Sequence, residues 1–496
     1  MDAQQRIAEL EAADAAKGAR IAQLETTVAA KDEEIAALKA QVATLMAQVA
    51  ALTKQVADLT EKLGQNSRNS HLPPSSDPPG SAGKPSGGGK QRSGRKRGGQ
   101  RGHRGSRRQL VPEAQVNDFV DLYPAECENC WAALPEEPDP HAKRYQTTEV
   151  PPIQPHTKEV RRHAVTCLCC GHKTRAAYDE NLIPASPFGP RLMSIVALLT
   201  GVYHVSRRKT ATLLSDLVGV PISLGAISAV EARVADAVSP AVDEAWTRVE
   251  GAAVKHTDGT SWLKAGALLA LWTIASTTAT VFKIVTDGSR ATLEPLYGAL
   301  RGILVSDRAT ALGFWAMERR QICWAHLLRK AVSFSERDGP SATFGRELLN
   351  YIGILFEYWH DYKAGKLDRE TFRAWMAPVR GQVEDLLARA AAVNIDRLSG
   401  SCANILAHKL ALWTFVDHAG VEPTNNHAER ELRAFVLWRR RCFGTQSDRG
   451  NLFAERLMTV AHTARKQGQD ILPFLTRCCE AQLAGTRTPS LFAAAA

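Results

Sequence analysis

A heptad repeat over the first 63 residues most restricts how this chain can fold. The a positions hold Ile21, Val28, Ile35, Val42, Val49, Val56 and Leu63, and the d positions hold Leu24, Leu38, Leu45, Leu52 and Leu59, with Lys31 interrupting. β-Branched residues at a with leucine at d favour a parallel two-stranded coiled coil. The alternative is one long amphipathic helix packed on its own protein. The narrow seam favours self-association, as a homodimer or higher homo-oligomer.

Residues near both ends of this repeat limit the helix. Asp14, Lys17 and Gly18 weaken the first heptads, so we expect that end to fray, and Gly64 should end the helix. Residues 65–112 are rich in Ser, Pro, Gly, Lys and Arg and cannot bury a core, which predicts a disordered linker.

The linker is also strongly basic, within a chain of net charge +10. No acidic residue lies between Asp77 and Glu113. A flexible basic arm gains affinity by releasing counterions from phosphates, although a solvated linker has the same composition. Such an arm binds DNA without selecting a sequence. The residues predicted to contact DNA here are Lys90, Arg92, Arg95, Lys96, Arg97, Arg101 and Arg104.

Several classes of protein are disfavoured. The segment MDAQQRIAEL lacks the basic and apolar regions of a secretory signal, and no apolar run reaches the roughly 18 residues of a membrane helix. Ten cysteines in 496 residues do not form a disulfide scaffold. We therefore expect a cytoplasmic protein with no membrane partner.

Two C-x2-C pairs predict a metal site. Cys127 and Cys130 form one pair, and Cys167 and Cys170 form the other, with a small β excursion expected over 146–165. Four thiolates suit one structural Zn²⁺ and leave no open position for catalysis. Buried free cysteines are the alternative, and Cys169 and His172 are substitute ligands.

The segment from Leu182 to about Val249 has a helical pattern. Two short helices, 206–217 and one opened by Ser223, flank a turn containing Gly219 and resemble a helix-turn-helix. Any helical bundle has such corners, so this piece alone does not decide between the two. Arg207 and Arg208 are its predicted DNA contacts.

The pattern changes after Gly251. Residues 254–262, 267–275 and 280–286 predict three strands of an antiparallel meander, followed by a helix capped by Ser289 and a short apolar strand, 302–306. This β-β-β-α-β order is that of the ribonuclease-H-like fold, in which the fourth strand lies parallel to the first.

This topology has a chemical consequence. Asp258 lies on the first strand with His256 on the same face, and Asp307 follows the fourth strand. Neighbouring strands lie about 4.8 Å apart. The two carboxylates could therefore bridge two Mg²⁺ (or Mn²⁺) ions, which prefer hard oxygen ligands.

A third carboxylate is expected from a later helix. Asn425 or Asn426 should cap it, Leu432, Phe435 and Val436 form its buried stripe, and Glu429 lies at the edge of that stripe. Basic residues around a carboxylate suit an approaching phosphate backbone. Those predicted to contact DNA are Arg430, Arg433, Arg439 and Arg440. A surface helix with a Glu429–Arg433 ion pair is the alternative.

Other polar residues nearby have weaker assignments. Asp287 is expected to serve loop geometry at a strand end, and Glu431 and Asp448 are less well placed than Glu429. His326, in the segment Cys323–His326, either approaches the site or is a satisfied core histidine.

At these residues the chain resembles the transposases of insertion-sequence family sixty-six, which use an Asp-Asp-Glu triad. The segments that carry the resemblance are 66–70, 73–77, 98–103, the cysteine pairs, 323–326, 424–430 and 447–450. The resemblance implies Asp258, Asp307 and Glu429 as the triad, terminal inverted-repeat DNA as substrate, and metal-dependent strand cleavage and transfer. It also implies a bacterial, nucleoid-associated protein that can use element-encoded accessory proteins.

Two positions depart from the family pattern. Gly259 follows Asp258 where the family more often has Glu, and Arg308 follows Asp307 where Gly is commoner. Neither change removes a metal ligand, but either could mark a decayed copy. A catalytically inactive, transposase-derived DNA-binding protein is therefore the alternative function.

The segment between the last two carboxylates is unusually long. Most of the excess has helical periodicity, with Trp359, Trp375 and Leu398, and predicts an all-helical insertion that contacts DNA or a second protomer. The predicted organisation is multidomain α+β: a coiled coil (1–64), a disordered basic linker (65–112), a zinc-binding module (113–180), a helical, helix-turn-helix-like DNA-binding region (181–250), a ribonuclease-H-like α/β catalytic core in two parts (251–335 and 412–450), a helical insertion (336–411) and a C-terminal helical segment and tail (451–496).

Overall fold

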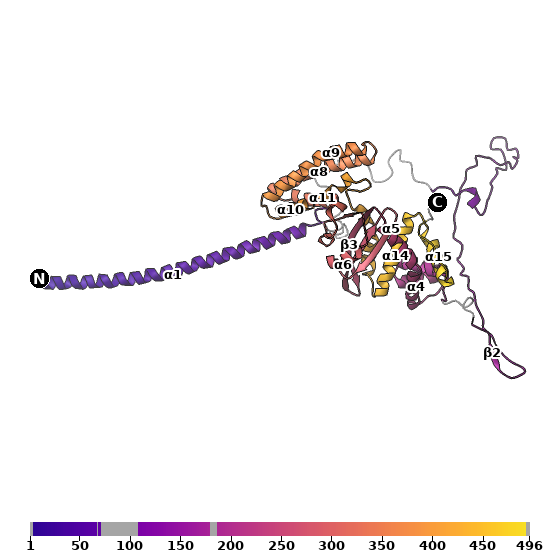
Figure 1. Cartoon of the computed structure of the whole chain (residues 1–496), viewed down its shortest axis with the longest axis horizontal. Coiled ribbons are helices and arrows are strands. Elements are labelled where there is room, and N and C mark those ends of the chain that lie inside the picture. The colour runs from indigo at the N-terminus through magenta and orange to yellow at the C-terminus, as the bar shows by residue number, and fades with distance from the viewer. Residues whose placement is uncertain (1–2, 67, 71–107, 179–185, 493–496) are drawn as a thin grey trace. The chain divides into compact units, whose positions relative to one another are not determined.

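The computed structural model describes residues 3–66, 68–70, 108–178 and 186–492 (Figure 1). Helices predominate and a five-stranded mixed sheet is present, so the predicted α+β class is confirmed. The chain divides into two compact units. We call Met1–Pro79 with Ile322–Ala419 the helical unit, and Gly80–Gln321 with Gly420–Ala496 the sheet unit.

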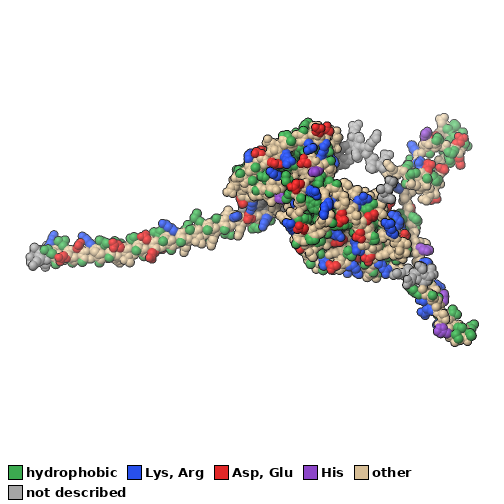
Figure 2. All heavy atoms as spheres, viewed as in Figure 1, with side chains coloured by type: hydrophobic (Ala, Val, Ile, Leu, Met, Phe, Trp, Pro, Cys, Tyr) green, Lys and Arg blue, Asp and Glu red, His purple; other side chains and the backbone are tan. Residues whose placement is uncertain are grey.

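The helical unit begins with one long helix, α1 (Ala3–Gly64), which ends at Gly64 as predicted. The helix runs unbroken through Asp14 and Gly18, and the fraying expected at that end stays a prediction. A single glycine costs a helix only about 1 kcal/mol, which the alanine-rich flanks tolerate. The heptad residues are exposed, for example Ile21 at 57% and Leu45 at 58%, and hydrophobic side chains recur along α1 in Figure 2.

By length and composition, α1 is also a helix that could cross a membrane, and such a single helix is weak evidence. Its apolar residues follow a heptad, with Gln41, Gln48 and Lys54 between them. The same composition suits a coiled coil.

The rest of the helical unit is all-helical, as the sequence predicts for most of it. Its helices are α7 (Trp324–Ser335), α8 (Pro340–Lys363), α9 (Arg369–Ala392), α10 (Ser399–Ala407), α11 (Lys409–Leu412) and α12 (Thr414–Asp417). Trp359 packs against Phe372 and Phe415, with ring centroids 6.0 and 5.7 Å away, and Leu398 is fully buried. Trp375, in contrast, is 45% exposed, because it lies on the outer side of α9.

The sheet unit contains β3 (Val254–Lys264), β4 (Ala267–Ala275), β5 (Thr280–Val285), β6 (Ile303–Ser306) and β7 (Arg320–Ile322), in the spatial order β5-β4-β3-β6-β7. β3, β4 and β5 form an antiparallel meander. The chain then passes through α6 (Arg290–Tyr297), and β6 pairs parallel to β3. The predicted meander and crossover are confirmed.

Helices cover both faces of the sheet, since alternate residues of a strand point to opposite sides. Trp262 and Phe282 point to one face, where both pack against Phe435 of α13 (Asn426–Cys442). On the other face Thr257 hydrogen-bonds Tyr297 of α6 at 2.5 Å. α5 (Ser239–Glu250) also contacts β5.

The outer edge of β5 is closed by α14 (Asp448–Lys466). Three side chains spaced four residues apart on this helix accept hydrogen bonds from backbone N–H groups of β5. Thr463 accepts from Thr280 at 3.1 Å, Thr459 from Phe282 at 3.2 Å, and Glu455 from Ile284 at 2.6 Å. These bonds satisfy donors that an edge strand otherwise leaves exposed.

The remaining helices of the sheet unit are α2 (Pro190–Ala197), the π-helical turn η3 (Leu198–Val202), α3 (Arg207–Val218), α4 (Leu224–Ala237) and α15 (Ile471–Ala484). Ser223 caps α4 by accepting from the Ala226 N–H at 3.1 Å, and Gly219 takes a left-handed conformation between α3 and α4. The two predicted helices and the glycine turn between them are therefore present, and their role as a helix-turn-helix stays a prediction.

The cysteine pairs flank short elements: the 3-10 turn η2 (Glu113–Gln115), β1 (Ala164–Thr166) and β2 (Lys173–Arg175). The predicted β excursion over 146–165 is wrong apart from its last two residues, which lie in β1. Pro151, Pro152 and Pro155 interrupt that segment, and proline has no N–H with which to join a ladder.

Two glycines of α8 predict opposite effects of the same change. A Cβ at Gly345 would lie 2.3 Å from the backbone nitrogen of Ser335, whereas a Cβ at Gly353 would meet no atom within 4 Å. Gly345→Ala should force α7 and α8 apart and destabilise the protein by about 1–3 kcal/mol. Gly353→Ala should stabilise it by about 0.5–1 kcal/mol through helix propensity. Thermal unfolding of both variants measures the difference, and shifts of the same sign would contradict this packing.

Candidate active site

Asp258 and Asp307 are brought together by strand pairing in the sheet unit. In the parallel pair β3–β6, Val254 lies opposite Ile303 and His256 opposite Val305. Asp258 lies two residues beyond the last residue of β3 that pairs with β6, and Asp307 directly follows the last residue of β6. The carboxyl ends of parallel strands meet at one edge of a sheet, so the strand pair brings the two aspartates to the same edge.

The two aspartates line one cavity of about 460 Å³. Thr260 and Ser261 of β3 contribute polar groups to its wall, and the loop after β5 contributes Asp287. Asp258 and Asp307 are each partly exposed. Two carboxylates are therefore accessible to a ligand from the same space.

The loop that carries Asp307 is held from within by Arg320, which is fully buried. Its guanidinium donates to the backbone oxygens of Asp307 at 2.8 Å and Ala309 at 3.3 Å, and to the Ser306 hydroxyl at 3.1 Å. The Asp307 carboxylate itself accepts from the Ala309 N–H at 2.9 Å. Arg320 thus fixes where Asp307 leaves the strand. Nothing in the local sequence marks it, because its partners are backbone atoms.

The N-terminus of α13 is attached to β3 beside Asp258. The Asn425 side chain donates to the backbone oxygen of Thr257 at 2.7 Å, and the rings of His256 and His427 stack 5.0 Å apart. The predicted cap is wrong in its chemistry, since Asn425 precedes the helix without capping it and instead binds the strand. One turn into this helix, Glu429 is partly buried and its Oε1 is fully buried.

Further along, the same helix packs on the same strand. Trp262 contacts Phe435 and Trp438, with ring centroids 5.4 and 6.0 Å away. The buried residues of α13 are Ala428, Leu432, Phe435 and Trp438, so Val436 of the predicted stripe is only partly buried. Two contacts thus bracket Glu429 along β3, one at His256 and one at Trp262.

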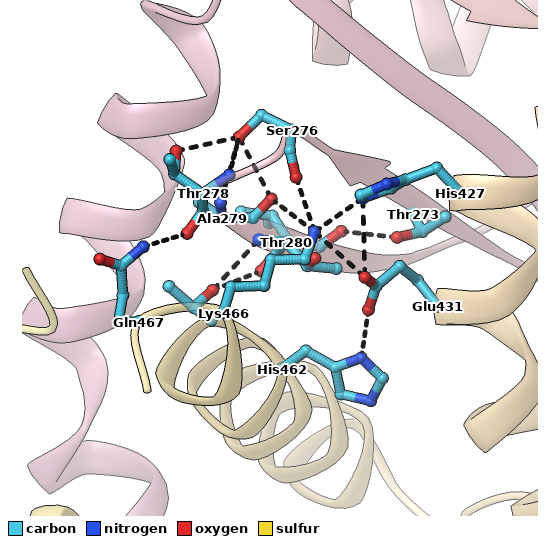
Figure 3. A network of polar contacts seen from close by, with 12 residues as sticks. Thr273, Ser276, Thr278, Ala279, Thr280, His427, Glu431, His462, Lys466 and Gln467 are labelled. Atoms are coloured by element: carbon cyan, nitrogen blue, oxygen red, sulfur yellow. Dashed lines mark hydrogen bonds and ion pairs between the residues drawn. The ribbon is translucent and has the colours of Figure 1, made fainter. Parts of the chain in front are cut away.

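A buried polar network joins α13 to α14 (Figure 3). Glu431 accepts from His462 and lies 3.1 Å from Lys466. Lys466 also contacts His427 Nε2 at 2.8 Å and donates to the backbone oxygen of Ser276 at 2.6 Å. Glu431 therefore points toward α14, on a different side of α13 from Glu429, as the sequence predicted.

The electrostatics of this network favour a charged pair. Burial alone raises the pKa of Glu431, but the hydrogen bond from His462 and the charge of Lys466 outweigh it and lower that pKa to about 2. Burial lowers the pKa of His256 to about 3, so this histidine is neutral at neutral pH. The carboxylate of Glu431 is thus matched by Lys466, while the stacked His256 carries no charge.

Other acids have structural partners. Asp287 accepts from the Ser289 N–H and from the Thr292 hydroxyl, both at 2.8 Å, which is the loop role that the sequence predicted. Asp448 is exposed and pairs with Lys264 at 2.6 Å. Cys323 and His326 lie at the start of α7 in the helical unit, so the approach of His326 to the carboxylates stays a prediction.

The predicted DNA contacts fall into three groups. Arg208, Arg430, Arg433 and Arg440 are exposed. Arg207 pairs with Glu231 at 2.5 Å and Arg439 donates to Thr260 and Ser261, so both also hold the fold together. The others, Lys90, Arg92, Arg95, Lys96, Arg97, Arg101 and Arg104, lie outside the described residues.

Each cysteine pair forms the same tight turn. The carbonyl of the first cysteine accepts from the N–H four residues later, at 3.0 Å for Cys127 and 2.9 Å for Cys167. The donors, Trp131 and Gly171, both take left-handed conformations, with φ of 59° and 70°. The two turns differ in sequence but have the same backbone conformation.

These turns direct backbone N–H groups at sulfur. Hydrogen bonds from Asn129 and Cys130 lower the pKa of Cys127, and those from Cys170 and Cys169 lower the pKa of Cys167. A thiolate is the form that binds zinc, so each pair fits half of a tetrahedral site. Within the described part of the chain, the two pairs are not gathered into one cluster.

Comparison with known families identifies the relatives of this chain. Residues 185–452 match the Transposase IS66 family, which is more than half of the 496 residues. The chain belongs to the IS66 transposase family. Residues 3–109, which include α1, match a family of unknown function, DUF6444. No curated protein matches the chain.

IS66 family membership indicates a DNA-processing enzyme, and the match includes Asp258, Asp307 and Glu429. The packing around Gly259 explains why this position departs from the family pattern. Gly259 lies opposite Trp272 in the β3–β4 pair, and a Cβ at this position would lie 2.8 Å from the indole ring. A larger residue here would require the Trp272 ring to move.

The Glu431 network predicts an acid-sensitive contribution to stability. Glu431 binds a proton more readily in the unfolded chain, so its carboxylate stabilises the fold above about pH 4.5 and loses this effect as the pH falls toward 2. Glu431→Gln should reduce the stability at pH 7 by about 3 kcal/mol and flatten its pH dependence over that range. Urea unfolding between pH 3 and 7 tests this, and equal pH dependence in variant and wild type would contradict it. Glu370→Gln, an exposed change on α9, is the control.

Proposed function

We propose that this protein is a DNA transposase that binds the terminal inverted repeats of an insertion sequence and catalyses metal-dependent strand cleavage and strand transfer. One observation carries the proposal: Asp258 and Asp307 line one cavity in the sheet of a chain that belongs to the IS66 family. The strand order, with β6 parallel to β3 after a three-stranded meander, supports a ribonuclease-H-like core.

Asp258, Asp307 and Glu429 are the proposed ligands of two Mg²⁺ or Mn²⁺ ions. Their donors are carboxylate oxygens, which match these hard cations better than zinc. When bound, such ions activate an attacking hydroxyl and neutralise charge on the leaving oxygen. The protein's own part is to hold the carboxylates in place. Arg320 fixes the loop of Asp307, and Asn425 fixes the start of the helix that carries Glu429.

DNA binding is assigned to several elements. The exposed arginines Arg208, Arg430, Arg433 and Arg440 suit phosphate contacts, and the basic linker adds affinity that is independent of sequence. The capped helices α3 and α4 suit a helix-turn-helix. One structural Zn²⁺ held by Cys127, Cys130, Cys167 and Cys170 would join the two cysteine turns.

Substitution of the triad tests the catalytic proposal. Asp258→Asn, Asp307→Asn and Glu429→Gln should each lower Mg²⁺-dependent nicking of inverted-repeat DNA by at least about 10³-fold, because each removes a charged ligand. Binding of the same DNA should be retained. The readout is cleavage of end-labelled DNA on a denaturing gel.

The matched control is Asp287→Asn. Asp287 lines the same cavity, but it accepts hydrogen bonds at the start of α6, which an asparagine can also accept. It should keep most of the cleavage activity. Cleavage retained in all three triad variants would refute the assignment. A wild-type protein that binds end DNA but never cleaves it is the outcome that favours the inactive, DNA-binding alternative.

The exposed seam of α1 is proposed to pair with a second copy of the chain. Ile21, Leu24 and Val28 lie together along the seam, with Glu25 and Asp32 beside them, and an isolated helix leaves these apolar side chains in water. Leu45→Asp combined with Leu52→Asp should convert a dimer into a monomer, as measured by light scattering of the full chain. Thr44→Asp, at a c position away from the seam, should leave the mass unchanged. A monomeric wild type would contradict the proposal.

A further inference from the structure

A second cavity, of about 620 Å³, lies within the helical unit. One wall is the first half of α9, and the opposite wall is formed by Trp413, Val416 and Asp417. Arg369, Arg373 and Arg380 line it together. Their spacings of four and seven residues place the three guanidinium groups on one face of α9.

Trp413 has a buried donor that the fold does not use. The residue is fully buried, and its indole Nε1 has no hydrogen-bond partner among the residues that the structure describes. The neighbouring Trp324, 5.0 Å away between ring centroids, donates its Nε1 to the backbone oxygen of Leu412 at 2.8 Å. A buried N–H without a protein partner leaves a donor that a ligand or water oxygen can satisfy.

Arg369 presents a second such donor. Its Nη2 donates to the backbone oxygens of Val416 at 2.8 Å and Phe415 at 3.2 Å. These bonds fix the guanidinium against the far wall of the cavity. Its Nη1 is buried and, in the described part of the chain, has no partner. Two fixed donors from opposite walls therefore belong to residues that line the same cavity.

The charges of the cavity favour an anion. Asp417 is shared between Arg373 at 4.0 Å and Arg380 at 3.7 Å, and Arg380 also pairs with Glu384 at 3.0 Å. Glu370 is the other acidic residue of the lining. Three guanidinium groups thus face two carboxylates, and the unused groups are all N–H donors. An oxyanion can accept from both donors, whereas a cation can accept from neither.

We propose that this cavity binds a phosphate of the DNA backbone. Arg369 Nη1 and Trp413 Nε1 are closed off in the unbound protein, so a side-chain shift at this wall must accompany entry of the phosphate before its oxygens accept from them. The exposed Arg373 contacts the same or the neighbouring phosphate. Planar guanidinium groups match phosphate oxygens in pairs. The choice of DNA as the source of the phosphate rests on the proposed function. The helical insertion is thereby a DNA-binding element, a choice that the sequence left open.

The test is DNA binding by the full chain in buffer without magnesium, so that catalysis does not contribute. Trp413→Phe removes the N–H and keeps a ring, and Arg373→Ala removes an exposed charge. Each should raise the Kd for duplex DNA about three- to tenfold, as measured by fluorescence anisotropy. Arg373→Ala should also reduce the slope of log Kd against log salt by about one, and Arg373→Lys should restore that slope.

The matched control is Arg389→Ala. Arg389 lies on the same helix but pairs with Glu347 at 2.9 Å and Asp385 at 3.1 Å, outside the cavity lining. Its Kd should stay within twofold of the wild type. Thermal unfolding checks that each variant folds, and because Arg373 is exposed, its replacement tests the proposal even if Trp413→Phe fails to fold.

Three outcomes would overturn the inference. The first is an unchanged Kd and salt slope in the Arg373 variant. The second is a change in tryptophan fluorescence when inorganic phosphate is added that is lost in Trp413→Phe, together with an unchanged DNA affinity of that variant. This result assigns the cavity to free phosphate. The third is a changed molecular mass with unchanged DNA affinity, which assigns it to a protein partner. A wild type that binds no DNA refutes the proposed function itself, whereas loss of cleavage with these binding effects intact refutes only the catalytic part.

Discussion

The pairing of β3 with β6 is the constraint on which the rest of the site depends. These two strands run parallel, and their register sets residue 256 opposite residue 305. Since side chains alternate between the faces of a sheet, a slip of one residue would turn one carboxylate to the opposite face from the other. α6 and the fully buried Leu304 and Val305 hold β6 in place, so hydrophobic burial fixes the register that positions Asp258 and Asp307.

The helix that carries Glu429 is fixed to the same strand by independent contacts. Asn425 binds the strand backbone at one end, and Trp262 packs against Phe435 and Trp438 at the other. The Glu431–Lys466 pair then ties α13 to α14, which closes the sheet edge at β5. Because α13 is fixed to β3 at two points and to α14 on another side, it loses little entropy when its carboxylate acquires a ligand.

Sequence patterns predicted the local elements well and the long-range polar contacts poorly. Alternation and turn residues gave four strands of the sheet, because burial on one face imposes a period of two. Arg320, Asn425 and Lys466 could not be predicted, because each binds backbone atoms brought close only by the fold. The same holds for Arg369 and Trp413, whose significance lies in donors left unused. Trp375 fitted a helical period yet is exposed, since periodicity does not say which face is covered.

Gly259 shows how a departure from a family pattern can follow from packing. Trp272 on the neighbouring strand fills the space where a side chain of residue 259 would stand. The glycine at position 259 is therefore understood only together with the tryptophan at position 272. The departure at Arg308 has no explanation in the structure.

The central claim is that three carboxylates distant in sequence hold the same ions. Cleavage of the polypeptide by radicals generated at bound Fe²⁺, substituted for Mg²⁺, tests it directly, since these radicals cut only the backbone close to the metal. The account predicts cuts near Asp258, Asp307 and Glu429 that all disappear with excess Mg²⁺. Cuts near the two aspartates with none near Glu429 would contradict it.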